Sequence, residues 1–315
     1  MESLQHLKGR LQAVKNISQI TKAMEVVSAT KMRRAQEYAL NSRPYAYKAL
    51  EILAEAALHA PIETTLTVKR PVKKTVAVVV SSDRGLVGAF NTQLVRAIDS
   101  FFAKDEYANN PKHSYGIVAV GKKSAAYATK KGYELIESFS GFGDYAEAEE
   151  IVPLADMLID GFEKGKWDRV VVLSTHFLTT LRQEVRQRQL LPVEVERIDE
   201  TVREIIPEHG RYAELANKET GGKKQETRDS EKYIFEPTPQ ETLQLLVPHL
   251  VRMQMYHLML EANASEHSAR RVAMKTATDN ANELSQNLLI EYNKTRQAGI
   301  TKEIIEITST QAALQ

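Results

Sequence analysis

Apolar residues recur at spacings of three and four along both ends of the chain, which is the pattern of helices with one apolar stripe. In the first segment the stripe comprises Leu4, Leu7, Leu11 and Val14 and then, one position out of phase, Ile17, Ile20, Met24 and Val27. We interpret it as a heptad-like stripe whose register shifts between its two halves. It predicts a long N-terminal helix over residues 1–60.

The C-terminal segment, residues 238–315, repeats this pattern over a greater length. A first stripe comprises Leu243, Leu246, Leu250, Met253, His257 and Leu260. A second stripe, of small residues that widen to leucines, comprises Ala273, Ala277, Ala281, Leu284 and Leu288. A helix of this length would span roughly 110 Å, more than the core of one domain can bury. We therefore expect the two terminal helices to pair as an antiparallel coiled coil.

Between these helices, residues 72–198 show an alternating α/β pattern. The predicted strands, rich in β-branched residues and buried on both faces, are Thr75–Val80, Tyr115–Val120 and Arg169–Leu173. The predicted helices are Phe90–Phe102, Lys122–Lys131 and Ala146–Phe162. Residues 182–191 alternate more weakly and predict an antiparallel strand after a turn at Thr179 and Thr180. The pattern is typical of a Rossmann-like open sheet.

Glycine usage separates these parts. Twelve of the 14 glycines lie between Gly85 and Gly222, so the ends are nearly free of a residue that weakens helices. Residues 199–232 are polar and predict a flexible surface loop. The expected fold class is α/β, with a long antiparallel coiled coil of the N- and C-terminal helices and an inserted Rossmann-like α/β domain.

Composition excludes several classes of function. Lysine and arginine number 42 and aspartate and glutamate 41, a balance that argues against a nucleic-acid-binding protein even though the first helix is basic. The absence of cysteine excludes disulfides, thiolate metal sites and a cysteine nucleophile. No run approaches the roughly 18 to 20 apolar residues of a membrane span, and the N-terminus lacks the apolar core of a secretory signal. We expect membrane contact only through a partner.

Two glycine-containing segments invite a nucleotide-binding interpretation. After the first predicted strand, Gly85 and Gly88 are spaced G-x-x-G and not G-x-G-x-x-G. A tight turn that packs helix against sheet is the favoured interpretation there, with phosphate binding as the alternative. In Gly116–Lys123 the serine that a P-loop needs comes one place late, and a strand occupies the loop. His249 and His257 are eight residues apart, which is not a metal-ligand spacing. We predict no catalytic residue, no metal and no cofactor.

Five motifs, in order along the chain, resemble one family. They are Ile20–Met32, Ser82–Leu86 with Phe90–Asn91, Tyr233–Pro237, Ala264–Ala281 and Tyr292–Ile304. Together they resemble the gamma subunits of F-type ATP synthases from one end of the chain to the other. The resemblance implies a central rotor shaft, not itself catalytic, that couples ion-driven rotation of a c-ring to ATP synthesis or hydrolysis at the β subunits.

The resemblance also implies roles for individual residues. Those expected to contact the β subunits are Lys22, Met24, Arg270, Arg296, Gln297, Thr301 and Glu303. Those expected to form a foot against the c-ring and the epsilon subunit are Tyr233, Phe235 and Glu236. The implied partners are the hexamer of α and β subunits, epsilon and the c-ring, with no nucleic acid. The implied location is the cytoplasmic face of a bacterial inner membrane.

Two other classes of function stay open from the residues alone. A coiled-coil tether or scaffold would explain the terminal helices, but its seam would stay apolar through residues 264–303. A nucleotide-dependent enzyme would explain the α/β domain, and it predicts ATP or NAD binding by the isolated chain.

Overall fold

The computed structural model describes residues 3–59, 64–108, 110, 112–142, 147–194 and 233–313. The predicted loop at 199–232 lies outside these residues. The chain forms two compact units. One comprises Met1–Ser28 with Arg270–Gln315, and the other, Ala29–Ala269, contains the sheet. The helices that link the units are α1 (Leu4–His59) and α7 (Pro239–Ala313).

The sheet of the unit Ala29–Ala269 has five strands in the order β3-β2-β1-β4-β5. Its strands are β1 (Lys74–Val80), β2 (Ser114–Val120), β3 (Glu134–Phe139), β4 (Arg169–Phe177) and β5 (Gln183–Leu191). The first four are parallel, and β5 returns antiparallel to β4. Thr179 and Arg182 exchange backbone hydrogen bonds of 3.0 and 3.3 Å across the turn between β4 and β5. The predicted fold class is confirmed.

Strand β3 is the one element of the sheet that the apolar pattern does not indicate. It forms an outer edge, and four of its six residues are exposed. Only Ile136 and Phe139 pack against the core beneath it. An edge strand needs few apolar side chains because it is partly exposed to water. Its sequence therefore lacks the run of apolar residues that predicted β1, β2 and β4.

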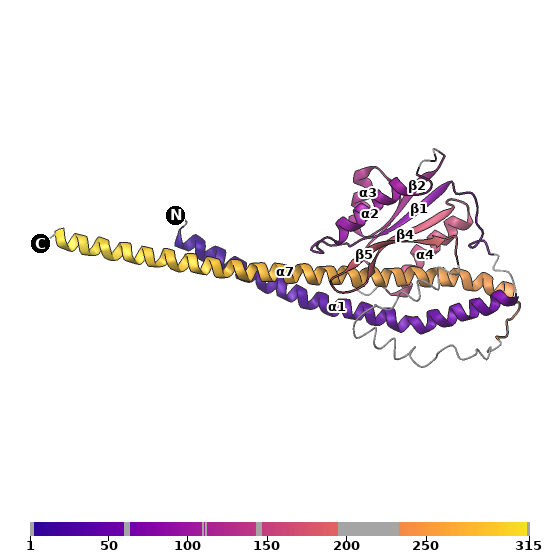
Figure 1. The fold of residues 1–315 in the computed structure, drawn as a ribbon, viewed down its shortest axis with the longest axis horizontal. Helices are drawn as coiled ribbons and strands as arrows, with labels where there is room; N and C mark the ends of the chain where they lie inside the picture. Colours follow the sequence, from indigo (N-terminus) through magenta and orange to yellow (C-terminus); the bar gives the residue numbers. More distant parts are fainter. Residues whose placement is uncertain are drawn as a thin grey trace. The chain divides into compact units, whose positions relative to one another are not determined.

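Helices cover both faces of the sheet (Figure 1). On one face lie α2 (Phe90–Lys104) and α3 (Lys122–Lys131), and on the other lie α4 (Ala148–Glu163) and parts of α1 and α7. Alternate residues of each central strand supply the two cores, as the pleat requires. Val76, Val78 and Val80 pack toward α4 and α7, whereas Ala77 and Val79 pack toward α2.

A close approach of Trp167 to α4 closes the end of the larger core. A Cβ built on Gly161 would lie 1.9 Å from the Trp167 ring, so only glycine fits. The Trp167 indole donates to the Leu158 carbonyl at 3.0 Å. The Arg70 guanidinium lies over the Phe162 ring at 4.3 Å and donates to the Phe162 carbonyl at 2.7 Å. These contacts fix the connection from α4 to β4.

One buried histidine of this unit has a strongly shifted pKa. His257 lies on α7 and is 3% exposed, and its Nδ1 is 3.4 Å from the Ser42 hydroxyl. Burial disfavours the charged imidazolium and lowers the pKa of His257 to about 4, although the nearby Glu261 carboxylate acts in the opposite direction. The side chain is therefore neutral at pH 7.

Replacing Gly161 with alanine is expected to lower the free energy of unfolding by about 2–3 kcal/mol, because the new methyl group displaces Trp167. Trp167 is the single tryptophan of the chain, so its fluorescence during urea denaturation of the isolated protein reports the change directly. Gly9→Ala is the matched control. Nothing lies within 4 Å of the corresponding Cβ in α1, so it should be neutral or stabilise by up to about 1 kcal/mol. Equal stabilities for the two variants would contradict the packing described.

His257 is expected to make the folded protein less stable as the pH falls. Below the ordinary histidine pKa of about 6.5, His257 is protonated in the unfolded chain but stays neutral in the folded chain down to about pH 4. Acidification therefore favours the unfolded chain, and stability present at pH 7 is lost. Between pH 7 and pH 5 the loss from this residue is about 2 kcal/mol. Urea denaturation at both pH values should show a smaller loss for His257→Gln than for the wild type. His6→Gln, at an exposed position, is the control, and an equal loss in all three proteins would rule out this origin.

Candidate functional site

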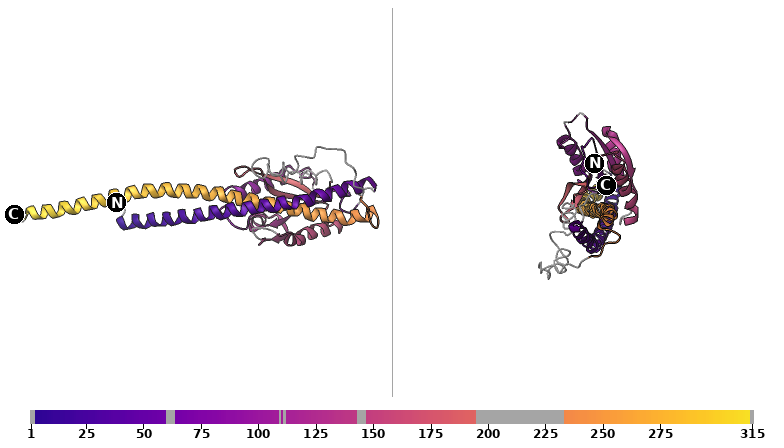
Figure 2. Two further views of the ribbon diagram at one scale, coloured as in Figure 1. Left: turned by 90° about the horizontal axis from the view of Figure 1, so that it is seen from below. Right: turned by 90° about the vertical axis from the view of Figure 1, so that its right-hand side faces the viewer.

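The helices α1 and α7 run antiparallel and side by side in the unit formed by Met1–Ser28 and Arg270–Gln315 (Figures 1 and 2). Near the N-terminus their seam is apolar. Leu7 and Leu11 of α1 pack against Leu288 of α7, with Val14 and Tyr292 beside them. The seam positions of α1 then continue at heptad spacing as Leu7, Leu11, Val14, Ser18, Thr21 and Ser28.

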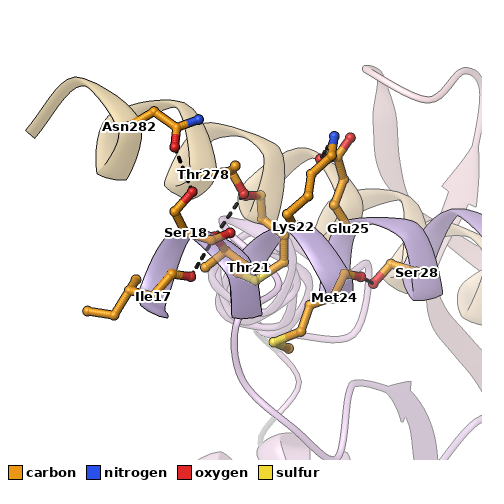
Figure 3. A network of polar contacts seen from close by, with 10 residues as sticks. Ile17, Ser18, Thr21, Lys22, Met24, Glu25, Ser28, Thr278 and Asn282 are labelled. Carbon is orange, nitrogen blue, oxygen red and sulfur yellow. Dashed lines mark hydrogen bonds and ion pairs between the residues drawn. The ribbon is translucent and has the colours of Figure 1, made fainter. Parts of the chain in front are cut away.

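Beyond Val14 the seam becomes polar (Figure 3). The Ser18 hydroxyl donates to the Asn282 side-chain oxygen at 2.6 Å. The Thr278 hydroxyl donates to the Thr21 hydroxyl at 2.8 Å. These two cross-helix hydrogen bonds set the antiparallel register, since each pairs one residue of α1 with one of α7.

The register shift expected within α1 is wrong. The seam stays in phase, and Ile17, Ile20 and Val27 lie outside it and are each more than half exposed. Small hydroxyl-bearing side chains can occupy a seam because they also bond to their own helix, as Thr21 does to the Ile17 carbonyl at 3.0 Å and Ser28 to the Met24 carbonyl at 2.7 Å. Hydrophobicity alone therefore misplaces the seam.

The second stripe expected in α7 needs the same correction. Leu284 is 46% exposed and lies outside the seam, whereas Met274, Thr278, Ala281 and Leu288 are buried. These four residues are spaced by four, three and seven positions, which is the heptad spacing found in α1.

Ile17, Ile20, Met24 and Val27 form an outer stripe on α1, at spacings of three, four and three. Its isoleucines and valine are exposed and Met24 is half-buried. Lys22, beside the stripe, is 61% exposed, and its ammonium binds the Glu25 carboxylate at 2.9 Å (Figure 3). An apolar stripe that faces away from its helix partner is the pattern of a surface that contacts another protein.

The residues expected near the C-terminus share one exposed stretch of α7. Arg296, Gln297, Thr301 and Glu303 are all exposed, and the Thr301 hydroxyl donates to the Gln297 carbonyl at 2.9 Å. Because the register pairs Ser18 with Asn282, α7 beyond about Arg296 extends past the first residue of α1. This part of α7, which we name the tip, is a single helix (Figure 2).

The tip also carries isoleucines that the sequence reasoning did not single out. They are Ile300, Ile304, Ile305 and Ile307, each about half exposed or more. Isoleucines grouped in an otherwise polar segment indicate a contact surface, because exposed isoleucines do not stabilise a helix that has no partner.

Arg270 does not join the tip residues. It lies 26 positions before Arg296, about 39 Å along the helix axis at 1.5 Å per residue. Thr278 faces Thr21, so Arg270 is far nearer to the level of Met24 than to the tip. The residues expected to contact a partner thus lie at two levels of the helix pair, one nearer to Met24 and one at the tip.

The foot residues lie just before the start of α7, in the unit Ala29–Ala269. Tyr233 is half-buried under the Lys48 ammonium, which is 5.3 Å from the ring centre, and Phe235 packs at the edge of the core. Glu236 is exposed and lines an open groove of about 470 Å³. Ile234, 87% exposed, and Leu245, 78% exposed, flank these residues and were missed because single apolar residues carry no periodicity. We name Ile234, Glu236 and Leu245 the foot surface.

The turn after β1 is filled by the protein's own side chains. The first N–H groups of α3 bind the Asp83 carboxylate, the Ser82 carbonyl and the Ser81 hydroxyl at 2.9, 3.3 and 2.8 Å. The other Asp83 oxygen accepts from the Gly141 N–H at 2.8 Å. Helix N-termini beside the ends of parallel strands are the usual phosphate sites of such folds. Here the carboxylate of Asp83 takes that place at α3.

In the part of the chain that the structure covers, no three histidine, aspartate or glutamate side chains are grouped as metal ligands. Among the described helices, none combines the length and the apolar character that crossing a membrane requires.

Known proteins resemble the chain over its full length. A family model described as ATP synthase matches residues 3–314. The ATP synthase gamma chain of Roseiflexus castenholzii is 39% identical over 317 residues, covering 100% of this chain and 99% of the relative. The ATP synthase gamma chain of Chlorobaculum parvum is 35% identical over 322 residues and covers 100% of both chains.

Solved structures agree in fold. A chain of the Euglena gracilis mitochondrial ATP synthase, from a structure of its OSCP, F1 and c-ring, superimposes with a TM-score of 0.62 at 18% identity, covering 99% of this chain and 94% of that one. A chain of the rotor of the same enzyme gives a TM-score of 0.58 at 19% identity, covering 94% and 98%. The family match and the relatives' identity, over the whole of this fold, lead to one conclusion: the chain belongs to the ATP synthase gamma chain family, the central rotor subunit of that enzyme.

Proposed function

We propose that this chain carries torque between a c-ring and the β subunits of its ATP synthase and has no catalytic site of its own. Ion flow turns the ring, the ring turns the chain, and the chain drives the β subunits through the conformations in which ATP is made or hydrolysed. Such coupling needs contacts that favour a different β state in each orientation.

The outer stripe and the tip support contact with a hexamer of α and β subunits. Both expose branched apolar side chains that this chain leaves unburied, and both lie beside exposed polar residues, Lys22 in one case and Arg296 with Gln297 in the other. The single observation that carries the proposal is that the seam beyond Val14 is polar while Ile17, Ile20 and Val27 are exposed.

The foot surface supports contact with the c-ring and the epsilon subunit at the other proposed end of the torque path. Ile234 and Leu245 expose apolar area next to Glu236 and the open groove. The chain would contact the membrane only through the c-ring, at the cytoplasmic face of a bacterial inner membrane. The bacterial relatives support that location.

The two alternatives find less support. A tether would bury its apolar residues in its own seam, yet this seam holds Ser18, Thr21 and Thr278. A nucleotide-dependent enzyme would keep the α3 N-terminus available, yet Asp83 occupies it.

Co-expression with the α and β subunits tests the proposal. The wild-type chain should enter a complex in one copy, and ATPase activity should depend on it. The Ile17→Ser/Ile20→Ser variant should keep the stability of the isolated chain within about 1 kcal/mol, because both positions are exposed. Its complex should lose ATPase activity or fall apart on dilution, whereas the control Gln19→Ser, at an exposed polar position, should not. If the wild-type chain did not enter the complex but bound nucleotide by itself, the rotor proposal would fail and the enzyme interpretation would be favoured.

Truncating Arg296 or Gln297 to alanine is expected to slow coupled ATP synthesis about fivefold or more, which corresponds to the loss of about 1 kcal/mol of contact with the β subunits. Lys294→Ala removes a positive charge two positions away on the same exposed helix and is the control. Synthesis driven by an imposed ion gradient in vesicles is the measurement. Unchanged synthesis in both tip variants would remove Arg296 and Gln297 from the proposed contact.

A further inference from the structure

Three polar residues on one face of α7 point at the hairpin formed by β4 and β5. They are Glu261, Ser265 and Ser268, at spacings of four and three, which places them in one row along the helix. Ser265 and Ser268 are completely buried and Glu261 is 17% exposed. All three lie in the unit Ala29–Ala269, in the last turns of α7 before that unit ends.

The two serines bind backbone carbonyls of the hairpin. Ser265 donates to the Thr175 carbonyl at 3.1 Å, and Ser268 donates to the Thr180 carbonyl at 2.9 Å. Strand β1 pairs with β4 only as far as Leu173, so the end of β4 has carbonyl groups with no neighbouring strand on that side. A buried carbonyl needs a donor, and the helix supplies it from a side chain.

Glu261 holds both strands of the hairpin at once. One carboxylate oxygen contacts Nδ1 of His176 on β4, and the other accepts from the Arg188 guanidinium on β5 at 2.9 Å. Arg188 Nη2 also lies 3.2 Å from the same His176 nitrogen. Charge-assisted hydrogen bonds of this kind are short and directional.

Apart from Thr278, which donates to Thr21 of α1, several other hydroxyls on α7 bond only within their own helix. Thr276, Thr301 and Thr308 each donate to a carbonyl of their own helix, which does not attach α7 to anything else. Ser265 and Ser268 instead donate across to a different element. The hydrophobic effect has no preferred direction of its own, whereas hydrogen bonds weaken steeply when their angles change.

From this geometry we infer that Glu261, Ser265 and Ser268, with the β4–β5 hairpin, form a rotational lock that prevents α7 from turning about its own axis against the sheet. We name it the polar joint. It rests on the proposed function, in which torque passes through the α/β unit into α7. The three side chains are positioning residues, and none contacts a reacting group.

A torsion measurement tests the joint. The chain has no cysteine, so a single Lys123→Cys change on the exposed start of α3 gives one attachment site for an optical probe, with α and β subunits also freed of cysteine. The hexamer is fixed to a surface and stalled with a non-hydrolysable ATP analogue. In the Glu261→Gln/Ser265→Ala/Ser268→Ala variant the angular variance of the probe is expected to rise about twofold or more, because the two serine hydrogen bonds are lost and the charge-assisted contacts of Glu261 are weakened.

The control variant makes matched changes in the same unit away from α7. Ser124→Ala removes a buried hydroxyl that bonds to Ser81, and Asp105→Asn weakens the half-buried ion pair with Arg169, 2.8 Å in length. Angular variance should stay at the wild-type value in this control. An equal rise in both variants would mean general loosening of the unit and would overturn the joint, as would an unchanged variance in the joint variant.

Hydrogen exchange on the isolated chain separates this proposal from the rotor proposal. Amide exchange in the turn 179–182 should become about tenfold faster in the joint variant and not in the control, whether or not the chain assembles with α and β subunits. If the joint variant fails to assemble, Ser265→Ala/Ser268→Ala replaces it in the torsion measurement and must still raise the variance. If the wild-type chain fails to assemble, the rotor proposal fails. Amide exchange in the turn 179–182 of the isolated chain then still tests whether the polar joint exists.

Discussion

A helix of 75 residues cannot be buried by a compact domain, and the need to give α7 a partner along its length governs the rest of this structure. The partner is α1, which comes from the opposite end of the chain, so the α/β unit has to be inserted between them. Pairing two helices as a coiled coil over many turns requires a seam of constant heptad phase. Leu7 and Leu11 set that phase at one end, and Ser18, Thr21 and Ser28 keep it where apolar residues do not.

The stabilising contacts of this helix pair are unevenly distributed. In the unit Ala29–Ala269, Leu53 of α1 and Leu250, Met255 and Leu258 of α7 are almost fully buried, and each such side chain contributes about 1.5–3 kcal/mol. Between Ser18 and Ser28 the seam has small hydroxyls, whose hydrogen bonds contribute only about 1 kcal/mol each. The α/β unit therefore holds the helices firmly, and in the other unit the isoleucines and valine of the outer stripe lie outside the seam.

Elements were predictable from the sequence where buried positions are apolar and exposed ones polar, and they were not predictable where residue type and burial disagree. Strands β1, β2 and β4 are buried on both faces, so Val76–Val80 and its neighbours had to be apolar and were recognisable. Strand β3 is a half-exposed edge and looks like a polar loop. The seam was misplaced because Ile20 resembles a buried residue and Thr21 does not, although Thr21 is the half-buried seam residue and Ile20 is exposed. Which side of α1 faces α7 depends on a register fixed by residues more than 250 positions away, such as Asn282, and no local pattern contains that information.

Polar and apolar groups are also placed differently in the parts of the chain that must stay fixed and on the surfaces whose contacts must change. Inside the chain, Glu261, Ser265 and Ser268 attach α7 to the sheet through bonds with strict angular demands. Toward the outside, the outer stripe and the tip present isoleucines and valine, whose contacts are non-directional, together with exposed charges whose single ion pairs are weak in water. A rotor must keep its own parts in fixed orientation while its contacts with surrounding subunits break and re-form at each step. Directional hydrogen bonds inside the chain meet the first demand, and non-directional apolar contacts on its surface meet the second. The stripe lies on α1 alone and the tip on α7 alone, so the surface of this unit is not symmetric about its long axis, as coupling by orientation requires.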